Sequence, residues 1–401
     1  MKFTIYSRTF VLISFCFSVH LTAEAGYSEP ASYKWPKKVI TLGSAGFSTS
    51  GWDDSWVFQK AINQVASAGG GRVHVPKGNY RVVNVNLKSD VHITVQTGSK
   101  ITLHKEGVMF NMSGDIANTS IRGIGGRFTM EMPDVNNARG VLLSSVRNAL
   151  VSNVNVQDPH QTRYPTLGAT WDQNTNKSAT DISFGNITQF QSNYGYGVAQ
   201  FQAVTRGTFW NIKCKNGVAL RFECGDWKIM TLSGYGGVFD CKANNTTSEQ
   251  GQAAIMLQPH VLNCGNVFMN GVSAVGSEFA ILNEKGGTWA FTADEIREHN
   301  LTTGSFGKLS MGNVNAVYWS GGVPTRWSHL DFYPKSELQK IYRENNTSGN
   351  VGPSCAVIGD YGLTRSAHST WNLSKTGAFV NPIISTRIYH HSDSEKNRPW
   401  K

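Results

Sequence analysis

The chain has little that would tie it to a membrane or to a metal. After residue 25 no apolar run approaches the roughly 18 residues that a membrane-spanning helix needs. No CxxC pair, no cysteine and histidine spacing typical of zinc and no compact acidic cluster suited to calcium occurs. Acidic residues are also scarce, 27 against 37 basic residues. The sequence therefore argues against a membrane or zinc protein and favours a polyanionic partner.

The first 25 residues have the pattern of a secretory signal peptide. A basic start is followed by an apolar run over residues 10–21 and by small residues at Ala23 and Ala25. We predict that residues 1–25 are removed and that residues 26–401 form a soluble, secreted protein. Without the two basic residues and one acidic residue of the signal, 35 basic and 26 acidic residues remain, a net charge of +9. Outside a cell, sulfated or uronate polysaccharides suit this charge better than nucleic acid.

Few cysteines remain after the signal is removed. The mature chain keeps five of them: Cys214, Cys224, Cys241, Cys264 and Cys355. This odd number leaves at least one thiol without a disulfide in a monomer. Disulfides between neighbouring strands and burial as small apolar side chains both stay open.

Short segments with alternating aliphatic residues and an Asn or Gly recur along the chain. Their middle residues fall at Asn153, Asn186, Asn211, Asp240 and Asn270, in steps of 33, 25, 29 and 30 residues. A β-sandwich would space its strands at about 8–12 residues with hairpin turns. Coils of a parallel β-helix have steps of this larger, irregular size, and each coil buries its apolar face against the next. The pattern predicts an all-β, single-domain parallel β-helix.

A solenoid needs caps, because its terminal coils would otherwise expose backbone and core. Apolar residues recur at helical spacing over residues 53–68, after Asp53 and Asp54 and before three glycines at 69–71. We predict an N-terminal capping helix there and coils from about residue 72 to 360. A short helix is expected over residues 336–344, and a loose tail follows the coils.

The strand-like segment 217–223 (GVALRFE) is the candidate active site. In a β-strand side chains alternate, so Ala219, Arg221 and Glu223 are predicted on one face and Val218, Leu220 and Phe222 on the other. Glu223 on a rigid strand, with Asp226 just beyond its end, supplies the two carboxyl groups that glycosidic-bond hydrolysis requires.

The central motifs resemble the iota-carrageenases in order and spacing. They are residues 194–200 (YGYGVAQ), 217–223, the glycine pair at 236–237, 253–256 (AAIM) and the following Pro259–His260. Weaker similarity extends the resemblance over roughly residues 50–360. The resemblance implies a right-handed β-helix that hydrolyses β-1,4 bonds of a sulfated galactan with inversion.

The resemblance also assigns catalytic roles. Glu223 matches the family's general acid, whereas the family's general base, an aspartate two residues further on, is replaced here by Gly225. We interpret Asp226 as the displaced base. Three residues along a strand would put it on the opposite face unless a bulge intervenes, and Gly225 permits a bulge because glycine tolerates positive φ.

Two further residues match the family's site. Gln200 matches a glutamine beside the catalytic water, although an exposed glutamine in an amide ladder would look the same. His260 matches the family's Pro-His and would bond the substrate or steady a carboxylate, unless it is a surface histidine. For Glu223 itself, the alternative is a surface ion pair with Arg221 or a neighbouring lysine.

Cations and aromatics are expected to bind the substrate. Sulfate esters need charge-assisted donors, and sugar faces stack on aromatic rings. The candidate substrate-binding residues are Arg221, Lys213, Lys215, Lys242, Lys285, Tyr194 and Tyr196. Each lysine would also suit a solvated surface. No metal site and no required cofactor is predicted, with calcium, sodium or chloride left open as bound ions, and we expect a monomer.

These residues lead to one mechanism and two rivals. A buried Glu223 with a raised pKa would protonate the leaving oxygen while Asp226 activates water, which requires a carboxyl separation of roughly 6.5–9.5 Å. A polysaccharide lyase on the same fold and a glycan-binding relative without activity are the alternatives, since the spacing between the acid and the base has changed.

Overall fold

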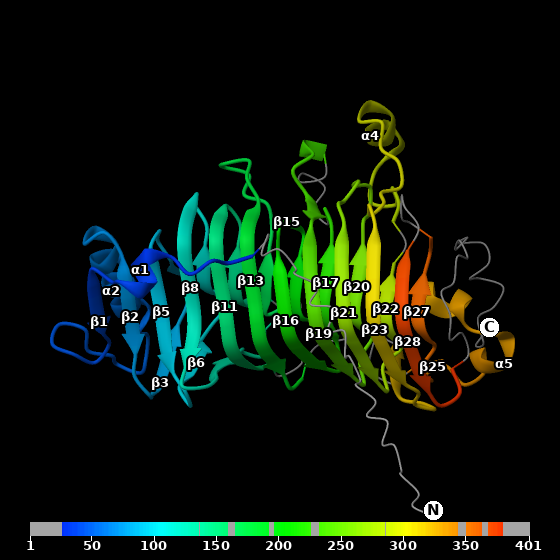
Figure 1. The fold of residues 1–401 in the computed structure, drawn as a ribbon, viewed down its shortest axis with the longest axis horizontal. Helices are drawn as coiled ribbons and strands as arrows, with labels where there is room; N and C mark the ends of the chain where they lie inside the picture. The colour runs from blue at the N-terminus through cyan, green and yellow to red at the C-terminus, as the bar shows by residue number, and fades with distance from the viewer. Residues whose placement is uncertain are drawn as a thin grey trace, which may run out of the picture.

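The protein is an elongated stack of parallel β coils running from the N-terminal to the C-terminal end (Figure 1). The computed structural model describes residues 26–135, 137–158, 165–191, 196–225, 232–284, 286–343, 350–362 and 368–379. Two parallel sheets form the walls of a right-handed parallel β-helix, and a small antiparallel sheet lies near the C-terminal end. The predicted fold class is confirmed.

The large sheet contains sixteen strands among the described residues. They are β1 (Lys38–Thr41), β2 (Gly71–Val75), β3 (Asn79–Val82), β5 (Val91–Gln96), β6 (Lys100–Leu103), β8 (Ile116–Ile124), β9 (Phe128–Glu131), β11 (Val146–Gln157), β13 (Ala179–Gln189), β15 (Ala203–Thr205), β16 (Thr208–Lys215), β18 (Gly237–Phe239), β19 (Cys241–Glu249), β21 (Val267–Val275), β23 (Leu309–Val317) and β28 (Ser369–Thr376).

The second sheet has nine strands in the described part of the chain. They are β4 (Val85–Asn86), β7 (Gly107–Met112), β10 (Ala138–Leu143), β12 (Leu167–Ala169), β14 (Gly197–Phe201), β17 (Val218–Glu223), β20 (Ala253–Gln258), β22 (Phe279–Asn283) and β27 (Ala356–Asp360). The remaining elements are β24 (Val323–Thr325), β25 (Tyr342–Arg343), β26 (Asn350–Gly352), α1 (Ala31–Lys34), α2 (Ser55–Ser67), α4 (Ala293–Glu298), α5 (Lys335–Leu338) and the 3-10 helix η1 (Trp327–Phe332).

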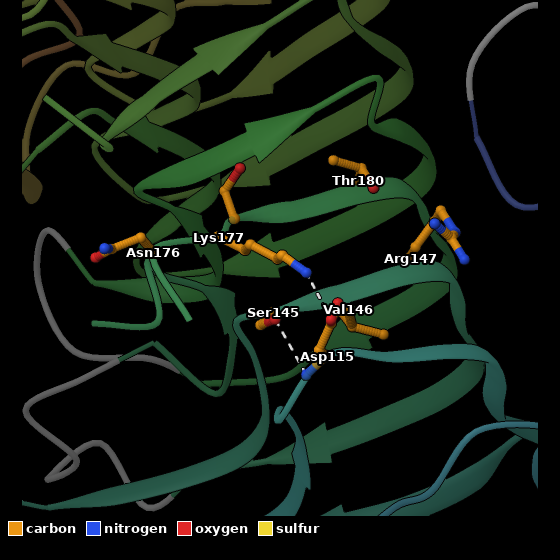
Figure 2. Close-up of a pocket in the computed structure, with 8 residues that line it drawn as sticks. Asp115, Ser145, Val146, Arg147, Asn176, Lys177 and Thr180 are labelled. Atoms are coloured by element: carbon orange, nitrogen blue, oxygen red, sulfur yellow. Dashed lines mark hydrogen bonds and ion pairs between the residues drawn. The ribbon is translucent and has the colours of Figure 1, made fainter. Parts of the chain in front are cut away.

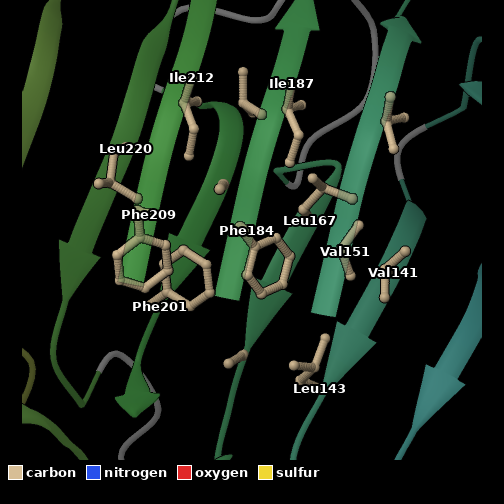
Figure 3. Packing of buried hydrophobic residues seen from close by; sticks show 14 of the residues in the cluster. Val141, Leu143, Val151, Leu167, Phe184, Ile187, Phe201, Phe209, Ile212 and Leu220 are labelled. Atoms are coloured by element: carbon tan, nitrogen blue, oxygen red, sulfur yellow. The ribbon is translucent and has the colours of Figure 1, made fainter. Parts of the chain in front are cut away.

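The core lies between the two sheets and consists of aliphatic and aromatic rows stacked along the axis (Figure 3). Phe201 from the nine-stranded sheet meets Phe184 and Phe209 from the large sheet, with ring centroids 5.0 and 4.4 Å apart. Burying a phenylalanine side chain contributes about 1.5–3 kcal/mol, so each coil gains stability only when its neighbours cover it.

An asparagine ladder bends the long strands of the large sheet. Asn153, Asn186, Asn211 and Asn245 have φ between 53° and 59°. Each of the last three donates a side-chain hydrogen bond to the asparagine before it, at 2.8–3.2 Å. Asparagine tolerates this left-handed conformation, which explains why the repeats carry it. Asp240, predicted as an equivalent position, instead precedes β19, and Asn245 takes its place in the ladder.

Helix α2 covers the first coils, as predicted for residues 53–68. Its apolar face, which includes Phe58 and Ile62, is buried in the core. Asp54 lies just before the helix, and its carboxylate accepts hydrogen bonds from the backbone N–H groups of Ser50, Gly51 and Arg81. The carboxylate therefore fixes the loop that enters the helix.

The C-terminal boundary of the coils differs from the prediction. Strand β28 pairs in parallel with β23, so the large sheet continues beyond residue 360. The expected helix over residues 336–344 is shorter, since α5 ends at Leu338. The predicted signal peptide and residues 380–401 lie outside the described residues. No helix in the described part of the chain has the length and apolarity needed to span a membrane.

The five cysteines after residue 25 are all described and buried, and none forms a disulfide. Burial raises the pKa of the Cys241 thiol to about 12. Of the two possibilities left open by the sequence, the structure supports burial as small apolar side chains.

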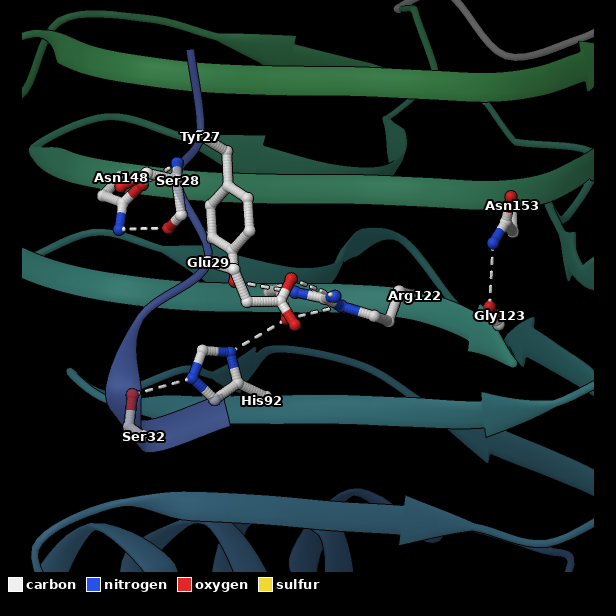
Figure 4. Close-up of polar contacts among 10 residues, drawn as sticks. Tyr27, Ser28, Glu29, Ser32, His92, Arg122, Gly123, Asn148 and Asn153 are labelled. Atoms are coloured by element: carbon white, nitrogen blue, oxygen red, sulfur yellow. Dashed lines mark hydrogen bonds and ion pairs between the residues drawn. The ribbon is translucent and has the colours of Figure 1, made fainter. Parts of the chain in front are cut away.

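An N-terminal strap, residues 26–35, crosses the outer face of the large sheet (Figure 4). Arg122 on β8 donates to Glu29 at 3.0 Å and to the Tyr27 hydroxyl at 2.7 Å. His92 on β5 lies 3.0 Å from Ser32 Oγ and 2.9 Å from Ser120 Oγ. The strap thereby ties together coils that are distant in sequence.

Candidate active site

Glu223 ends strand β17 on the outer face of the nine-stranded sheet. Leu220 and Phe222 point into the core between the sheets, and Arg221 and Glu223 alternate with them. The predicted alternation fails at the start of the strand, where Ala219 lies in the core and Val218 packs on the outside. Two consecutive residues, Ala219 and Leu220, therefore face the core.

The carboxylate of Glu223 is buried against three polar side chains. Arg221 Nη2 donates to Oε1 at 2.8 Å, and its Nε lies 2.5 Å from Oε2. Gln200 Nε2 also donates to Oε2, and His260 Nε2 lies 3.4 Å from Oε1. Glu223 is only 6% exposed, so the predicted outward orientation holds but the carboxylate is not open to solvent.

The sheet register brings these residues together. Gln200 on β14 is paired with Arg221 on the next strand, β17. Glu223 is paired with Gln258 at the end of β20, and His260 follows two residues later with φ of 50°. Three stacked coils therefore deliver one residue each to the carboxylate, as expected for parallel strands whose ends meet at one edge.

These contacts distinguish between the alternatives that the sequence left open. Gln200 is 5% exposed and bonds Glu223, so it is not an exposed ladder residue. His260 is also 5% exposed and is not a surface histidine. The ion pair between Glu223 and Arg221 exists, but it is buried rather than solvated.

The charge state of Glu223 differs from the prediction. Burial alone would raise its pKa, but Arg221, the hydrogen bond and charge of His260, and the charge of Arg326 outweigh burial and lower the pKa to about 2. In the substrate-free protein Glu223 is therefore ionised at neutral pH. The expected raised pKa is wrong for this state, because the ion pair with Arg221 was considered only as a surface pair and it is buried.

Several predicted site residues lie outside the described residues: Asp226, Tyr194 and Lys285. Gly225, just before Asp226, has φ of 68°, the positive φ that the predicted bulge needs. Tyr196 is described, and its ring lies 5.3 Å from the Arg221 guanidinium carbon. Tyr196 and Arg221 therefore lie beside Glu223, and their role in substrate binding stays a prediction.

The predicted lysine strip does not share a sheet with Glu223. Lys213 and Lys215 alternate with buried residues and project outward, as expected, but they lie on β16 of the large sheet. Lys242 lies on β19 of the same sheet. Lys213 forms an ion pair with Glu249. The chain turns between β16 and β17, so these three lysines lie on a different wall from Glu223, and their role in substrate binding stays a prediction.

Sequence reasoning missed a second buried cluster beside the site. It comprises Glu278 and Glu284, which flank β22, and His329 in η1, with the partly buried Arg326 next to it. All four residues lie within the weaker part of the resemblance, and no motif of the sequence pointed to them. Trp289 was also missed; it is 68% exposed and its ring lies 5.5 Å from that of His260.

A separate pocket lies at β8, β11 and the loop before β13 (Figure 2). It has a volume of about 340 Å³. Lys177 and Asp115 form an ion pair across it at 2.5 Å, and Arg147 lies at its edge. Both partners of the ion pair are more than half exposed, and none of the predicted site residues lines the pocket. No group of three or more histidine, cysteine, aspartate or glutamate residues suited to a metal occurs in the described part of the chain.

Comparison with known proteins gives relatives of one kind. No protein-family model matches the chain. The chain is 28% identical over 370 residues to an iota-carrageenase of Zobellia galactanivorans, covering 77% of this chain and 75% of that protein. It is also 28% identical over 309 residues to an iota-carrageenase of Alteromonas macleodii, covering 72% of this chain but only 61% of that protein.

Solved structures agree on the fold. A GH82 iota-carrageenase from A. fortis has a TM-score of 0.80 at 21% identity, covering 92% of this chain and 96% of that one. An iota-carrageenase complexed to iota-carrageenan fragments has a TM-score of 0.78 at 22% identity, covering 91% and 94%. The fold and the relatives define the chain as a glycoside hydrolase on a right-handed parallel β-helix. The family they support is the iota-carrageenases, so the predicted resemblance is confirmed.

Proposed function

We propose that this protein is a secreted, endo-acting hydrolase that cleaves β-1,4 linkages of a sulfated galactan, iota-carrageenan first of all, with inversion. The observation that carries the proposal is the buried Glu223 carboxylate on the outer face of β17, held by Arg221, Gln200 and His260. The curated relatives, both iota-carrageenases, support the substrate class.

In this proposal Glu223 is the general acid and Asp226 the general base. Gln200 orients the attacking water, and His260 steadies the Glu223 carboxyl group at 3.4 Å. The positive φ of Gly225 supports a bulge that returns Asp226 to the face of Glu223. Inversion requires the two carboxyl groups to be roughly 6.5–9.5 Å apart, with the water between them.

The low pKa of Glu223 gives substrate binding a second role. An acid must carry a proton, and Arg221 holds this one ionised in the free protein. A sulfate group of the substrate is an anion whose oxygens can accept two donors of the Arg221 guanidinium in place of the carboxylate. When a sulfate binds Arg221, the buried Glu223 carboxylate loses its main counter-ion. The pKa of Glu223 then rises, and Glu223 binds the proton needed for catalysis.

Further contacts to the substrate follow from the same site. Tyr196, beside Arg221, offers a ring to a sugar face, and Tyr194 and Lys285 are proposed to add a ring and a cation. The enzyme is proposed to act as a monomer after removal of residues 1–25. It requires no cofactor in this mechanism, which is compatible with structural calcium or sodium and with a chloride near the active site.

The proposal is tested by replacing the acid. Glu223→Gln keeps the shape of the side chain and the contact with Gln200 but cannot donate the proton, so we expect turnover to fall at least about a thousand-fold. Folding and polymer binding should persist. Glu131→Gln, in an exposed pair with Lys100 on the large sheet, is the matched control and should retain full activity. Turnover by Glu223→Gln close to the wild-type rate would defeat the assignment.

A substrate panel separates the rival classes. The protein is incubated with iota-, kappa- and lambda-carrageenan, alginate and pectin, and new reducing ends are measured. Reducing ends from iota-carrageenan support the proposal, with intermediate oligosaccharides early in digestion as the mark of endo cleavage. Unsaturated, ultraviolet-absorbing ends would indicate a lyase, and polymer binding without new ends would indicate a binding protein.

A further inference from the structure

Beside the site, one buried histidine joins two buried glutamates. Glu278 directly precedes β22 and Glu284 directly follows it. His329 Nδ1 lies 2.7 Å from Glu278 and its Nε2 lies 2.9 Å from Glu284. The side chains of Glu278 and His329 are fully buried, and that of Glu284 is 5% exposed. Both ring nitrogens face carboxylates, so the ring must be an imidazolium that donates to both.

Neighbouring side chains fix this arrangement. Thr325 and Tyr333 both donate to Glu278, the latter at 3.2 Å, and Ser328 Oγ lies 3.4 Å from Glu284. The His329 ring packs edge-on against Phe279. Two carboxylates and one imidazolium leave one negative charge, and the cations next to Glu284 are Arg326 and Arg221.

The sheet register connects this cluster to the catalytic acid. Glu223 is paired with Gln258, and the Glu284 N–H donates to Leu257 O at 2.7 Å, which aligns Glu284 with Gln258. Glu223, Gln258 and Glu284 therefore form a row across three adjacent strands. Strands lie about 4.8 Å apart, so the two carboxyl-bearing residues are roughly 10 Å apart with a neutral amide between them.

We propose that Glu278, His329 and Glu284 form a buried charge chain that sets how firmly Arg221 and Arg326 hold the carboxylate of Glu223. The proposal rests on the proposed role of Glu223 as general acid. The three residues are positioning residues, since they act through the arginines and do not touch the substrate.

The physical basis is competition for two cations. Arg326 lowers the pKa of both Glu223 and Glu284, and Arg221 contributes to the same two carboxyl groups. While Glu284 is ionised, it also interacts with these arginines, and this weakens their stabilisation of the Glu223 carboxylate. His329 keeps Glu284 ionised, and Glu278 keeps His329 protonated. The titratable and charged groups that interact with the three residues are Arg221, Arg326, Tyr333 and Cys355. Glu223 and His260 lie on the other side of the arginines.

The test is the pH dependence of kcat at saturating carrageenan, whose alkaline limb reports the general acid in the complex. Glu284→Gln removes an anion that competes with Glu223 for Arg326, the cation left when a sulfate binds Arg221, so ionised Glu223 is stabilised and the limb should move to lower pH. The expected shift is about one pH unit. This is the pKa change caused by removing a unit charge roughly 10 Å away at an effective dielectric constant of about 20. Glu278→Gln, which is further away, should shift the limb in the same direction by less than half as much.

Controls separate this effect from structural damage. Glu284→Asp keeps the charge and should restore the wild-type limb, and Glu131→Gln should leave the limb in place. A purely structural role would lower the height of the profile without moving the limb. If Glu284→Gln does not fold, as judged by thermal unfolding, the shift of the alkaline limb in the Glu278→Gln protein tests the proposal instead.

Two failures are distinguishable. An unmoved or upward-shifted limb in a folded Glu284→Gln or Glu278→Gln protein overturns the charge chain while leaving Glu223 as the acid. Wild-type turnover by Glu223→Gln would instead overturn the proposed function itself, and the limb would then belong to another group.

Discussion

Two outer faces of the β-helix are each covered by a segment that contacts or contains a buried histidine, and the two histidines have opposite charge states. The N-terminal strap packs on His92 of β5, and the C-terminal segment, residues 325–333, contains His329. Under the N-terminal strap, burial and then the charges of Arg122 and Arg72 lower the pKa of His92 to about 3. Under the C-terminal segment, Glu278 and Glu284 overcome burial and raise the pKa of His329 to about 9. Both side chains are 0% exposed.

Burial favours the neutral form of both histidines, so the difference shows that the partners decide whether a buried histidine carries a charge. His92 meets two serine hydroxyls and the Tyr33 ring, which suit a neutral imidazole. His329 meets two carboxylates, which suit only the cation. The strap therefore contributes to stability alone, whereas the C-terminal segment also places charge beside the proposed catalytic acid.

The largest expected contrast is in stability at pH 7. His329→Gln leaves two buried carboxylates without their cation, which should cost about 3–5 kcal/mol of unfolding free energy. His92→Gln can keep one of two neutral hydrogen bonds and should cost about 1 kcal/mol. Urea unfolding of both variants checks the difference. Equal losses would show that the two histidines do not differ in charge.

The pH dependence of stability should have opposite signs for the two histidines. The folded-state pKa of His92 lies below its ordinary value, so its contribution is lost as pH falls from about 6.5 towards 3. That of His329 lies above the ordinary value, so its contribution is lost as pH rises from about 6.5 towards 9. Each contribution changes by about 1.4 kcal/mol per pH unit within its window.

Unfolding curves at intervals from pH 4 to pH 9 measure both effects. On the acid side, wild type should lose stability relative to His92→Gln; on the alkaline side, it should lose stability relative to His329→Gln. Parallel curves for wild type and either variant would contradict the corresponding assignment.

The smallest expected effect comes from replacing one arginine on each face, Arg122 or Arg221, by lysine. The first replacement should change stability and not activity. Arg122→Lys loses the guanidinium donors that bond Glu29 and Tyr27. It also loses the stacking on Tyr33, whose ring centroid lies 3.8 Å from the guanidinium carbon. The free energy of unfolding of this variant should fall by about 1 kcal/mol. Its kcat should not change. Arg221→Lys, by contrast, should change both KM and the pH profile. Reduced kcat in a folded Arg122→Lys protein would show that the strap influences the site.

Much of the fold was predictable because it depends on local patterns. Strand periodicity, the spacing of the coils and the helix over residues 53–68 follow from apolar positions and backbone preferences. The ladder position of Asn245 was missed because Asp240 also tolerates positive φ, and only the stacking of strands identifies which residue lies in the row.

The site was predictable in part. Motif order identified Glu223, Gln200 and His260, and strand alternation put Arg221 next to the acid. The lysines on β16 were misplaced because residues eight to ten positions before Glu223 lie on another wall of the coil. Glu284 and His329 were missed because their partners are separated from them by about fifty residues or lie on other strands.

The amino-acid sequence alone determined that the chain forms stacked coils and which carboxyl group is the candidate acid, because both follow from short-range periodicity and motif order. The tertiary structure alone decided the charge of that acid and of the buried histidines. Their protonation depends on Coulomb interactions and desolvation at distances of a few ångströms, between residues that only the stacking of the coils brings together.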